Sequence, residues 1–387
     1  MTELINPKNR EASQEAPLHS FLFYFLRLGA LGFGGPIALV GYMQRDLVEG
    51  RRWISRDDFL EGLALAQLAP GPLAAQLAIY LGYLRAGFWG ATLVGFAFIL
   101  PSFLMVLGLS AAYVRYGGLP WMQALFYGIG AAVIGIITRS AAKLIKSSLG
   151  SDPLLWIIFS VLAVSTAVTG KEIIWLFLLG GLIPLFIRIF RERTAGRSLP
   201  RLTLVLTVGA LPLTNRFFEI FLYFSKAGLF VFGSGLAIVP FLYGGVVQQH
   251  HWLNDRQFID AVAVAMITPG PVVITVAFIG YLVGGLAGAT AAALGVFLPV
   301  YLVVVILGPY YKAISKDPRV SAFAKGVTAA AVGAIAGAVV VLARRSLHDL
   351  PTVAIGVGTL ILLLRWKIPE PLIILAAALL GLALYRG

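Results

Sequence analysis

The chain has 387 residues, of which 59% are hydrophobic and only 12% are charged. Because charged residues make up about a quarter of soluble domains, this composition excludes a soluble globular protein. Apolar runs of about 20 residues favour membrane-spanning helices over a transmembrane barrel, whose strands alternate in character over roughly ten residues. We therefore predict an all-α polytopic protein embedded in the lipid bilayer.

The formal net charge of +13 comes from basic residues in the short connections between apolar runs. This distribution is typical of the positive-inside bias and argues against nucleic-acid binding. The chain has no cysteine, and its four histidines, His19, His250, His251 and His348, lack the spacing of metal ligands. We therefore expect neither a metal site nor a cofactor.

The first element in chain order is a polar stretch, residues 1–19, which is typical of a cytoplasmic tail and has no signal-cleavage pattern. Two membrane repeats are then expected at 20–190 and 215–387, joined at 191–214 by a basic linker with a short apolar run. Each repeat contains six apolar blocks, at 20–48, 57–84, 87–114, 120–146, 153–169 and 171–190, and at 217–247, 256–283, 285–311, 320–345, 350–365 and 369–385.

The chain is duplicated, because the segment from Phe25 to Pro72 aligns with the segment from Phe224 to Pro271 without a gap. Apolar composition alone would not keep tryptophans, Pro-Gly-Pro runs and charges in register. The duplication therefore indicates a transporter built from two structural repeats. Matched residues include Trp53 and Trp252, Pro70-Gly71-Pro72 and Pro269-Gly270-Pro271, and, after one deletion, Gly82 and Gly280, Gly90 and Gly288, and Pro101 and Pro299.

The orientation of the second repeat depends on the short apolar run at 202–213. If this run crosses the membrane, the repeats are inverted; if it lies at the interface, they are parallel. The run is short for a span of about 30 Å. Basic residues at 312–319 fall on the cytoplasmic side only in the inverted arrangement, whereas Arg344 and Arg345 then fall outside. We expect inverted repeats, with these two arginines as an exception.

Glycine and proline interrupt the first two blocks of each repeat, because glycine adopts non-helical dihedrals and proline lacks a backbone N–H. Each block is therefore either a hairpin or two half-helices, and the arginines at 45–56 favour hairpins. Unwound backbone at membrane depth is costly unless it is buried in protein or lines a cavity, and restarting helices present free N–H groups to anions. Proline kinks and small-residue packing are the structural alternative. We expect an anion site at Gly34, Gly35, Pro36, Pro70, Gly71, Pro72, Gly233, Ser234, Gly235, Pro269, Gly270 and Pro271.

Two basic residues, Arg27 and Lys226, lie at matched positions in the first helix of each repeat. Each would share a helix face with a break glycine two turns later, Gly34 or Gly233. An intramembrane cation costs about 2.5 to 3.5 kcal/mol by insertion scales, which makes both residues candidates for an ion path. Snorkelling to the membrane interface is the alternative.

Polar side chains near the breaks are few. Their hydroxyl and amide groups suit an oxyanion, although hydrogen bonds between helices explain them nearly as well. They are Gln67, Gln76, Ser234, Thr268 and Thr275.

Glu61 and Asp260 are matched acids that precede the Pro-Gly-Pro runs. We expect them to carry coupling protons, the alternative being solvated helix starts that complement the helix dipole.

The chain resembles the chromate ion transporter family in its long two-domain form. The resemblance rests on Phe33-Gly34-Gly35-Pro36, the run from Gln67 to Pro72, Phe232-Gly233-Ser234-Gly235 and Pro269-Gly270-Pro271. It implies a bacterial or archaeal plasma-membrane protein that exports chromate by using the proton gradient, with sulfate as a competing ion. It also implies that the two halves insert with opposite orientations.

Two other functions are compatible with parts of this pattern. A sulfate or other oxyanion importer or exchanger would have the same fold and charges. An intramembrane enzyme would need a nucleophile and base or metal ligands at membrane depth, and the sequence provides neither, so we expect no enzymatic activity. Lipid-facing surfaces do not reveal whether the protein forms oligomers.

Overall fold

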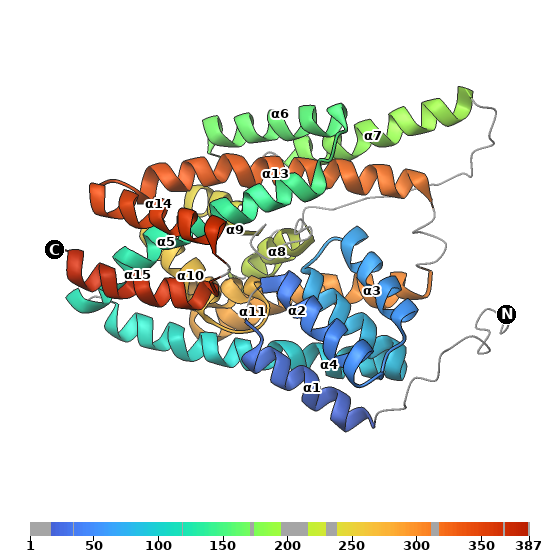
Figure 1. Ribbon diagram of the computed structural model, residues 1–387, viewed down its shortest axis with the longest axis horizontal. Helices are drawn as coiled ribbons and strands as arrows, with labels where there is room; N and C mark the ends of the chain where they lie inside the picture. Colours follow the sequence, from blue (N-terminus) through green and yellow to red (C-terminus); the bar gives the residue numbers. More distant parts are fainter. Residues whose placement is uncertain are drawn as a thin grey trace.

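The computed structural model describes residues 17–33, 35–117, 119–170, 174–194, 216–229, 238–310, 317–366 and 368–385. Within these ranges every regular element is helical, which confirms the all-α prediction (Figure 1). The predictions made for Gly34, for the apolar run 202–213 and for Gly233, Ser234 and Gly235 lie outside the described residues.

The elements follow the predicted blocks. The first repeat contains α1 (Leu18–Leu31), α2 (Gly35–Met43), the π-helical η2 (Gln44–Gly50), α3 (Arg56–Leu68), α4 (Leu73–Tyr116), α5 (Pro120–Ser148), α6 (Pro153–Thr169) and α7 (Ile174–Thr194). The second contains α8 (Arg216–Leu229), α9 (Ile238–Tyr243), η4 (Gly244–Gln249), α10 (Asp255–Ile267), η5 (Val272–Ile274), α11 (Thr275–Leu307), η6 (Gly308–Tyr310), α13 (Pro318–Ser346), α14 (Leu350–Arg365) and α15 (Glu370–Leu384).

The backbone repeats as well as the sequence. Helix α4 reverses at Gly87 (φ 58°, ψ −143°), and α11 reverses at the matched Gly285 (φ 61°, ψ −150°). Arg52 and His251, also a matched pair, are the non-glycine residues with positive φ in the described chain. The reversals divide α4 into α4a (73–85) and α4b (88–116), and α11 into α11a (275–283) and α11b (286–307).

The interrupted blocks are hairpins. Trp53, which follows η2, lies against Phe21 near the start of α1, with ring centroids 6.2 Å apart. In the second repeat His250, which directly follows η4, pairs with Glu219 in the first turn of α8 at 3.2 Å. The chain therefore returns to the level at which each first helix begins, so the break at Gly32 is the tip of a hairpin.

The second block of each repeat is also a hairpin. Helix α3 packs against α4, and Gly62 lies against the ring of Tyr80, with the Pro-Gly-Pro run midway between them. Helices α10 and α11 pack together in the corresponding arrangement. Both Pro-Gly-Pro runs are therefore hairpin tips.

The two repeats are inverted. Thr92, near the start of α4b, shares a hydrogen bond of 2.7 Å with Tyr301, near the end of α11b. Tyr113, near the end of α4b, contacts Asp260 close to the start of α10. Matched helices therefore run antiparallel, as the sequence predicts. We call the side on which α1 begins the first face, and the side on which α8 begins the second face.

Long helices exchange partners between the repeats. Helix α13 packs against α6 and α7, whereas α5 packs against α14 and α15 (Figure 1). Small residues allow these contacts, because Gly128 meets the backbone of Gly381 and the matched Gly326 meets that of Gly180. In the described chain four helices, two of which include the reversals, are long and apolar enough to cross a membrane.

Close backbone contact at the reversals generates a stability prediction. A Cβ atom on Gly82 would lie 2.5 Å from the carbonyl oxygen of Gly90, whereas one on Gly108 would meet nothing within 4 Å. We expect Gly82→Ala to lower the free energy of unfolding by about 1–3 kcal/mol, as overpacking does. Thermal denaturation in detergent measures this effect. Gly108→Ala is the matched control, and an equal loss in both variants would contradict the packing argument.

Candidate functional site

The interruptions of the two repeats meet in the interior. The backbone N–H of Gly270 donates to the carbonyl oxygen of Gly32 over 2.8 Å, which joins the second Pro-Gly-Pro tip to the tip of the first hairpin. Gly270 also lies against Ser102 of α4b, and the matched Gly71 lies against Val300 of α11b. Each Pro-Gly-Pro tip therefore rests on the long helix of the other repeat.

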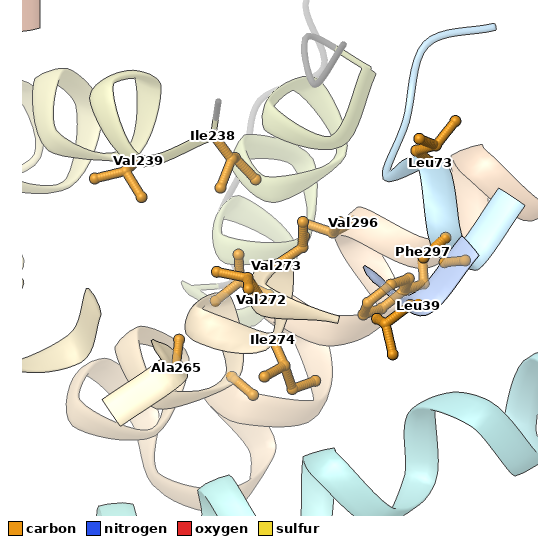
Figure 2. Close-up of a cluster of buried hydrophobic side chains, with 14 of the residues drawn as sticks. Leu39, Leu73, Ile238, Val239, Ala265, Val272, Val273, Ile274, Val296 and Phe297 are labelled. Atoms are coloured by element: carbon orange, nitrogen blue, oxygen red, sulfur yellow. The ribbon is translucent and has the colours of Figure 1, made fainter. Parts of the chain in front are cut away.

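Apolar side chains from both repeats surround this junction. Figure 2 shows part of the cluster, with Leu39 and Leu73 from the first repeat and Val272, Val296 and Phe297 from the second. All five are buried. The unwound backbone is therefore enclosed in protein, which is the condition under which it is tolerated at membrane depth.

The polar residues beside the Pro-Gly-Pro tips bind backbone. The amide of Gln76 donates to the carbonyl oxygens of Ala69 and Pro70, over 3.3 and 2.7 Å. The matched Thr275 donates to Val272 over 2.7 Å, and Thr268 donates to a carbonyl in the preceding turn. These donors fix the shape of the tips. Gln67 differs, because its side chain is exposed on α3.

A groove of about 640 Å³ separates the two arms of the first hairpin. It extends from Gly50 and Arg51 at the first face to Gly32 at the hairpin tip. Its cations are Arg27, Arg45 and Arg51, and its acid is Asp46. The remaining lining residues are Tyr24, Leu28, Leu31 and Tyr42.

The charges in this groove are unequally paired. Arg45 binds Asp46 at 2.9 Å, and Arg51 lies 4.5 Å from the ring centroid of Trp53. Arg27 is exposed in the groove and has no ion-pair or hydrogen-bond partner among the described residues. The groove is therefore a basic cavity in which the Arg27 guanidinium is unpaired within the described part of the chain. A guanidinium binds tetrahedral oxyanions well.

The sequence prediction for Arg27 needs one correction. Helix α1 ends at Leu31, so the helical face that holds Arg27 does not continue to Gly34. The sequence analysis also missed Arg45 and Arg51 as site residues. Folding the first block as a hairpin would have placed both arginines opposite Arg27.

In the second repeat, the positions matched to Arg45 and Arg51 carry neither arginine nor lysine. Lys226 is exposed like Arg27, and no described residue pairs with it. Gly244 and His250 stand where the first repeat has Arg45 and Arg51. His250 pairs with Glu219 at 3.2 Å and stacks on Trp252. Because the repeats are inverted, Arg27 and Lys226 lie on opposite sides of the tips.

The matched acids also differ. Asp260 is 3% exposed and accepts a hydrogen bond of 2.7 Å from the hydroxyl of Tyr113, which belongs to the other repeat. Glu61 is only partly buried on α3. Of the two acids, Asp260 is therefore the one that is enclosed between the repeats.

A second polar cavity, of about 360 Å³, lies beside Asp260 toward the second face. It also contains Asp255, Arg345, His348 and Ser346, whose buried hydroxyl has no hydrogen-bond partner among the residues that the structure describes. At its outer edge, hydrogen bonds from Tyr127 and then from Thr352 hold the pKa of the Asp349 carboxyl below its usual value. This cavity connects a buried acid with charged groups at the second face.

Comparison with known proteins matches the chain twice to the chromate transporter family, over residues 19–185 and 218–382. A chromate transport protein of Cupriavidus metallidurans is 59% identical over 377 residues, covering 95% of this chain and 93% of the relative. A probable chromate transport protein of Synechococcus elongatus is 57% identical, covering 92% and 93%. A chromate transport protein of Pseudomonas aeruginosa is 33% identical, covering 92% and 90%. No solved structure matches the chain. The matches cover both repeats, with their hairpins and the basic groove, and the chain therefore belongs to the chromate transporter family.

Proposed function

We propose that the protein exports chromate from the cytoplasm and that protons moving inward drive the export. The observation that carries this proposal is the pairing of a basic groove, which opens at the first face, with a buried carboxylate near the second face. The named activity of the relatives, chromate transport, supports the choice of ion. Transport also needs no catalytic group at the site.

Loop charges support a cytoplasmic first face. Arg51, Arg52 and Arg56 follow the first hairpin, Lys146 ends α5, and Arg365 ends α14, all at this face. Under the positive-inside rule, this face and the N-terminus are cytoplasmic. The bacterial origin of the relatives supports the plasma membrane of a prokaryotic cell as the location.

Chromate would enter through the groove. A dianion that reaches Arg27 gains a charge-assisted hydrogen bond, and Arg45 and Arg51 add positive potential along its path. The path then reaches Gly32, where the hairpin tips meet. Gly35, Pro36, Gly71 and the other break residues supply backbone geometry to this proposed site.

Asp260 would carry the coupling proton. A buried carboxylate is costly when charged, so loss and gain of its proton alter the contacts that hold α10 in place. Tyr113 stabilises the charged form by donating a hydrogen bond from the opposite repeat. Protonation of Asp260 would therefore weaken a contact between the repeats.

Sulfate import is the second candidate function, because sulfate has the same charge and shape as chromate. Uptake of radiolabelled chromate and sulfate into inside-out and right-side-out vesicles distinguishes the two. We expect inside-out vesicles to accumulate chromate when their interior is acidic. Sulfate uptake confined to right-side-out vesicles would contradict the export proposal.

Arg27 provides the first functional prediction. We expect Arg27→Ala to raise the KM for chromate about tenfold or more, because a hydrogen bond to a charged group contributes about 1.5–3 kcal/mol. Arg27→Lys should retain part of the affinity, and Lys226→Ala should also slow transport. The measurement is initial uptake into inside-out vesicles.

Lys146→Ala is the matched control for Arg27→Ala, since it removes an exposed positive charge from the same face outside the groove. An equal rise in KM in both variants would reduce the role of Arg27 to general surface charge.

Asp260 provides a second functional prediction. We expect Asp260→Asn to abolish the stimulation of chromate uptake by a pH gradient, because an amide neither binds nor releases the proton. Glu61→Gln tests the matched acid in the same way. Uptake by each variant is compared with and without an imposed gradient, after membrane insertion has been checked. Gradient-dependent uptake that persists in both variants would exclude these acids as proton carriers.

A further inference from the structure

Matched residues of the two repeats differ in burial. Ile259 of α10 is 8% exposed, whereas the matched Leu60 of α3 is 48% exposed. Met266 is 5% exposed, while the matched Gln67 is exposed. The second repeat therefore buries a surface of α10 whose counterpart on α3 of the first repeat is exposed.

Helix packing shows the same asymmetry. Helices α5, α6, α7, α13, α14 and α15 form a bundle. Helix α10 packs against α5 and α15 of this bundle, and α9 packs against α13. In the described part of the chain, α3 makes no comparable contact with α13 or α7, and neither does α2 with α5. The hairpins of the second repeat are thus closed onto the bundle at the second face, and those of the first repeat stand away from it.

At the second face, three side chains from different elements hold α10 in this closed position. Nη1 of Arg345, at the end of α13, donates to both carboxylate oxygens of Asp255, over 3.0 and 3.1 Å. The hydroxyl of Tyr243 in α9 donates to the same carboxylate, and the Arg345 guanidinium lies 5.6 Å from the centroid of its ring. We call Asp255, Arg345 and Tyr243 the second-face latch.

The first repeat cannot form the same latch. Arg56, Ser147 and Gln44 occupy the matched positions, so neither a carboxylate nor a phenol is present. The closed second face is therefore a property of the second repeat's own residues.

We infer that this conformation is open to the first face, and that the second-face latch must release in each cycle for chromate to leave. The inference rests on the proposed function. Because the repeats are inverted, the opposite state arises when they exchange conformations: α3 closes on α13 and α7, and α10 moves away from α5 and α15. The side chains of Arg345 and Asp255 are 44% and 42% exposed. Because solvent weakens ion pairs that are this exposed, the pair can break in each cycle.

The natural absence of cysteine permits a direct test of the latch. Asp255→Cys and Arg345→Cys are combined, and a reversible bifunctional methanethiosulfonate bridges the two thiols in inside-out vesicles. We expect bridging to abolish chromate uptake and a reductant to restore it. Each single-cysteine variant should show the same uptake with and without this treatment.

Comparison of the bridged protein with the unsubstituted protein distinguishes failure of the latch from failure of the proposed function. Unchanged uptake by the bridged protein would overturn the latch while leaving chromate transport intact. Absence of uptake by the unsubstituted protein would count against the proposed function instead.

A second measurement does not depend on transport by the cysteine pair. Gln67→Cys and Met266→Cys, single cysteines at matched positions, are labelled with a membrane-impermeant maleimide from either face. We expect Gln67→Cys to react from the first face and Met266→Cys to be protected. Adding Asp255→Asn should raise labelling of Met266→Cys from the second face at least severalfold. Equal labelling of the two cysteines, or no response to Asp255→Asn, would overturn the inference.

Discussion

The structure depends on enclosing unwound backbone inside a membrane protein. Each hairpin tip exposes peptide groups that lipid cannot satisfy, so the tips must find partners in protein. The hydrogen bond from Gly270 to Gly32 meets this requirement by joining a tip of one repeat to a tip of the other. Because each tip also rests on a long helix of the opposite repeat, at Ser102 or Val300, neither repeat can enclose its own breaks. This mutual dependence places the junction of the hairpin tips, the proposed ion site, at the boundary between the two repeats.

The exchange of long helices supplies a frame against which the hairpins would move in the proposed cycle. Helix α5 holds α14 and α15, and α13 holds α6 and α7, through glycine contacts such as Gly128 with Gly381 that allow close approach. The hairpins, by contrast, contact this frame unequally at the two faces. In the proposed cycle, the hairpins would therefore shift against the bundle while the interlocked helices remain in place.

Much of the fold could be predicted from the sequence, because breaks and reversals require particular residues. Gly87 and Gly285 are duplicated since the reversal needs positive φ, and the Pro-Gly-Pro runs mark the tips in both copies. The site was less accessible to this reasoning. Arg45 joins Arg27 only after the hairpin folds, and equal sequence positions do not reveal that Asp260 is buried while Glu61 is partly exposed. Arg345 contradicted the charge rule in the sequence, and its ion pair with Asp255, distant along the chain, accounts for its position at the second face.

Inversion also determines how the two matched cations can act on a dianion. Arg27 lies four residues before the end of α1, Lys226 lies three residues before the end of α8, and the two helices begin at opposite faces. They therefore lie in series along the proposed path, on either side of the midplane. A single pocket with two fixed cations would bind a dianion tightly and release it slowly, since conduction requires binding that is weak enough to leave. In the proposed mechanism, cations in series would avoid this difficulty, because the ion would exchange one for the other as the repeats exchange conformations. The three arginines of the first-face groove would then favour capture of the dianion on that side.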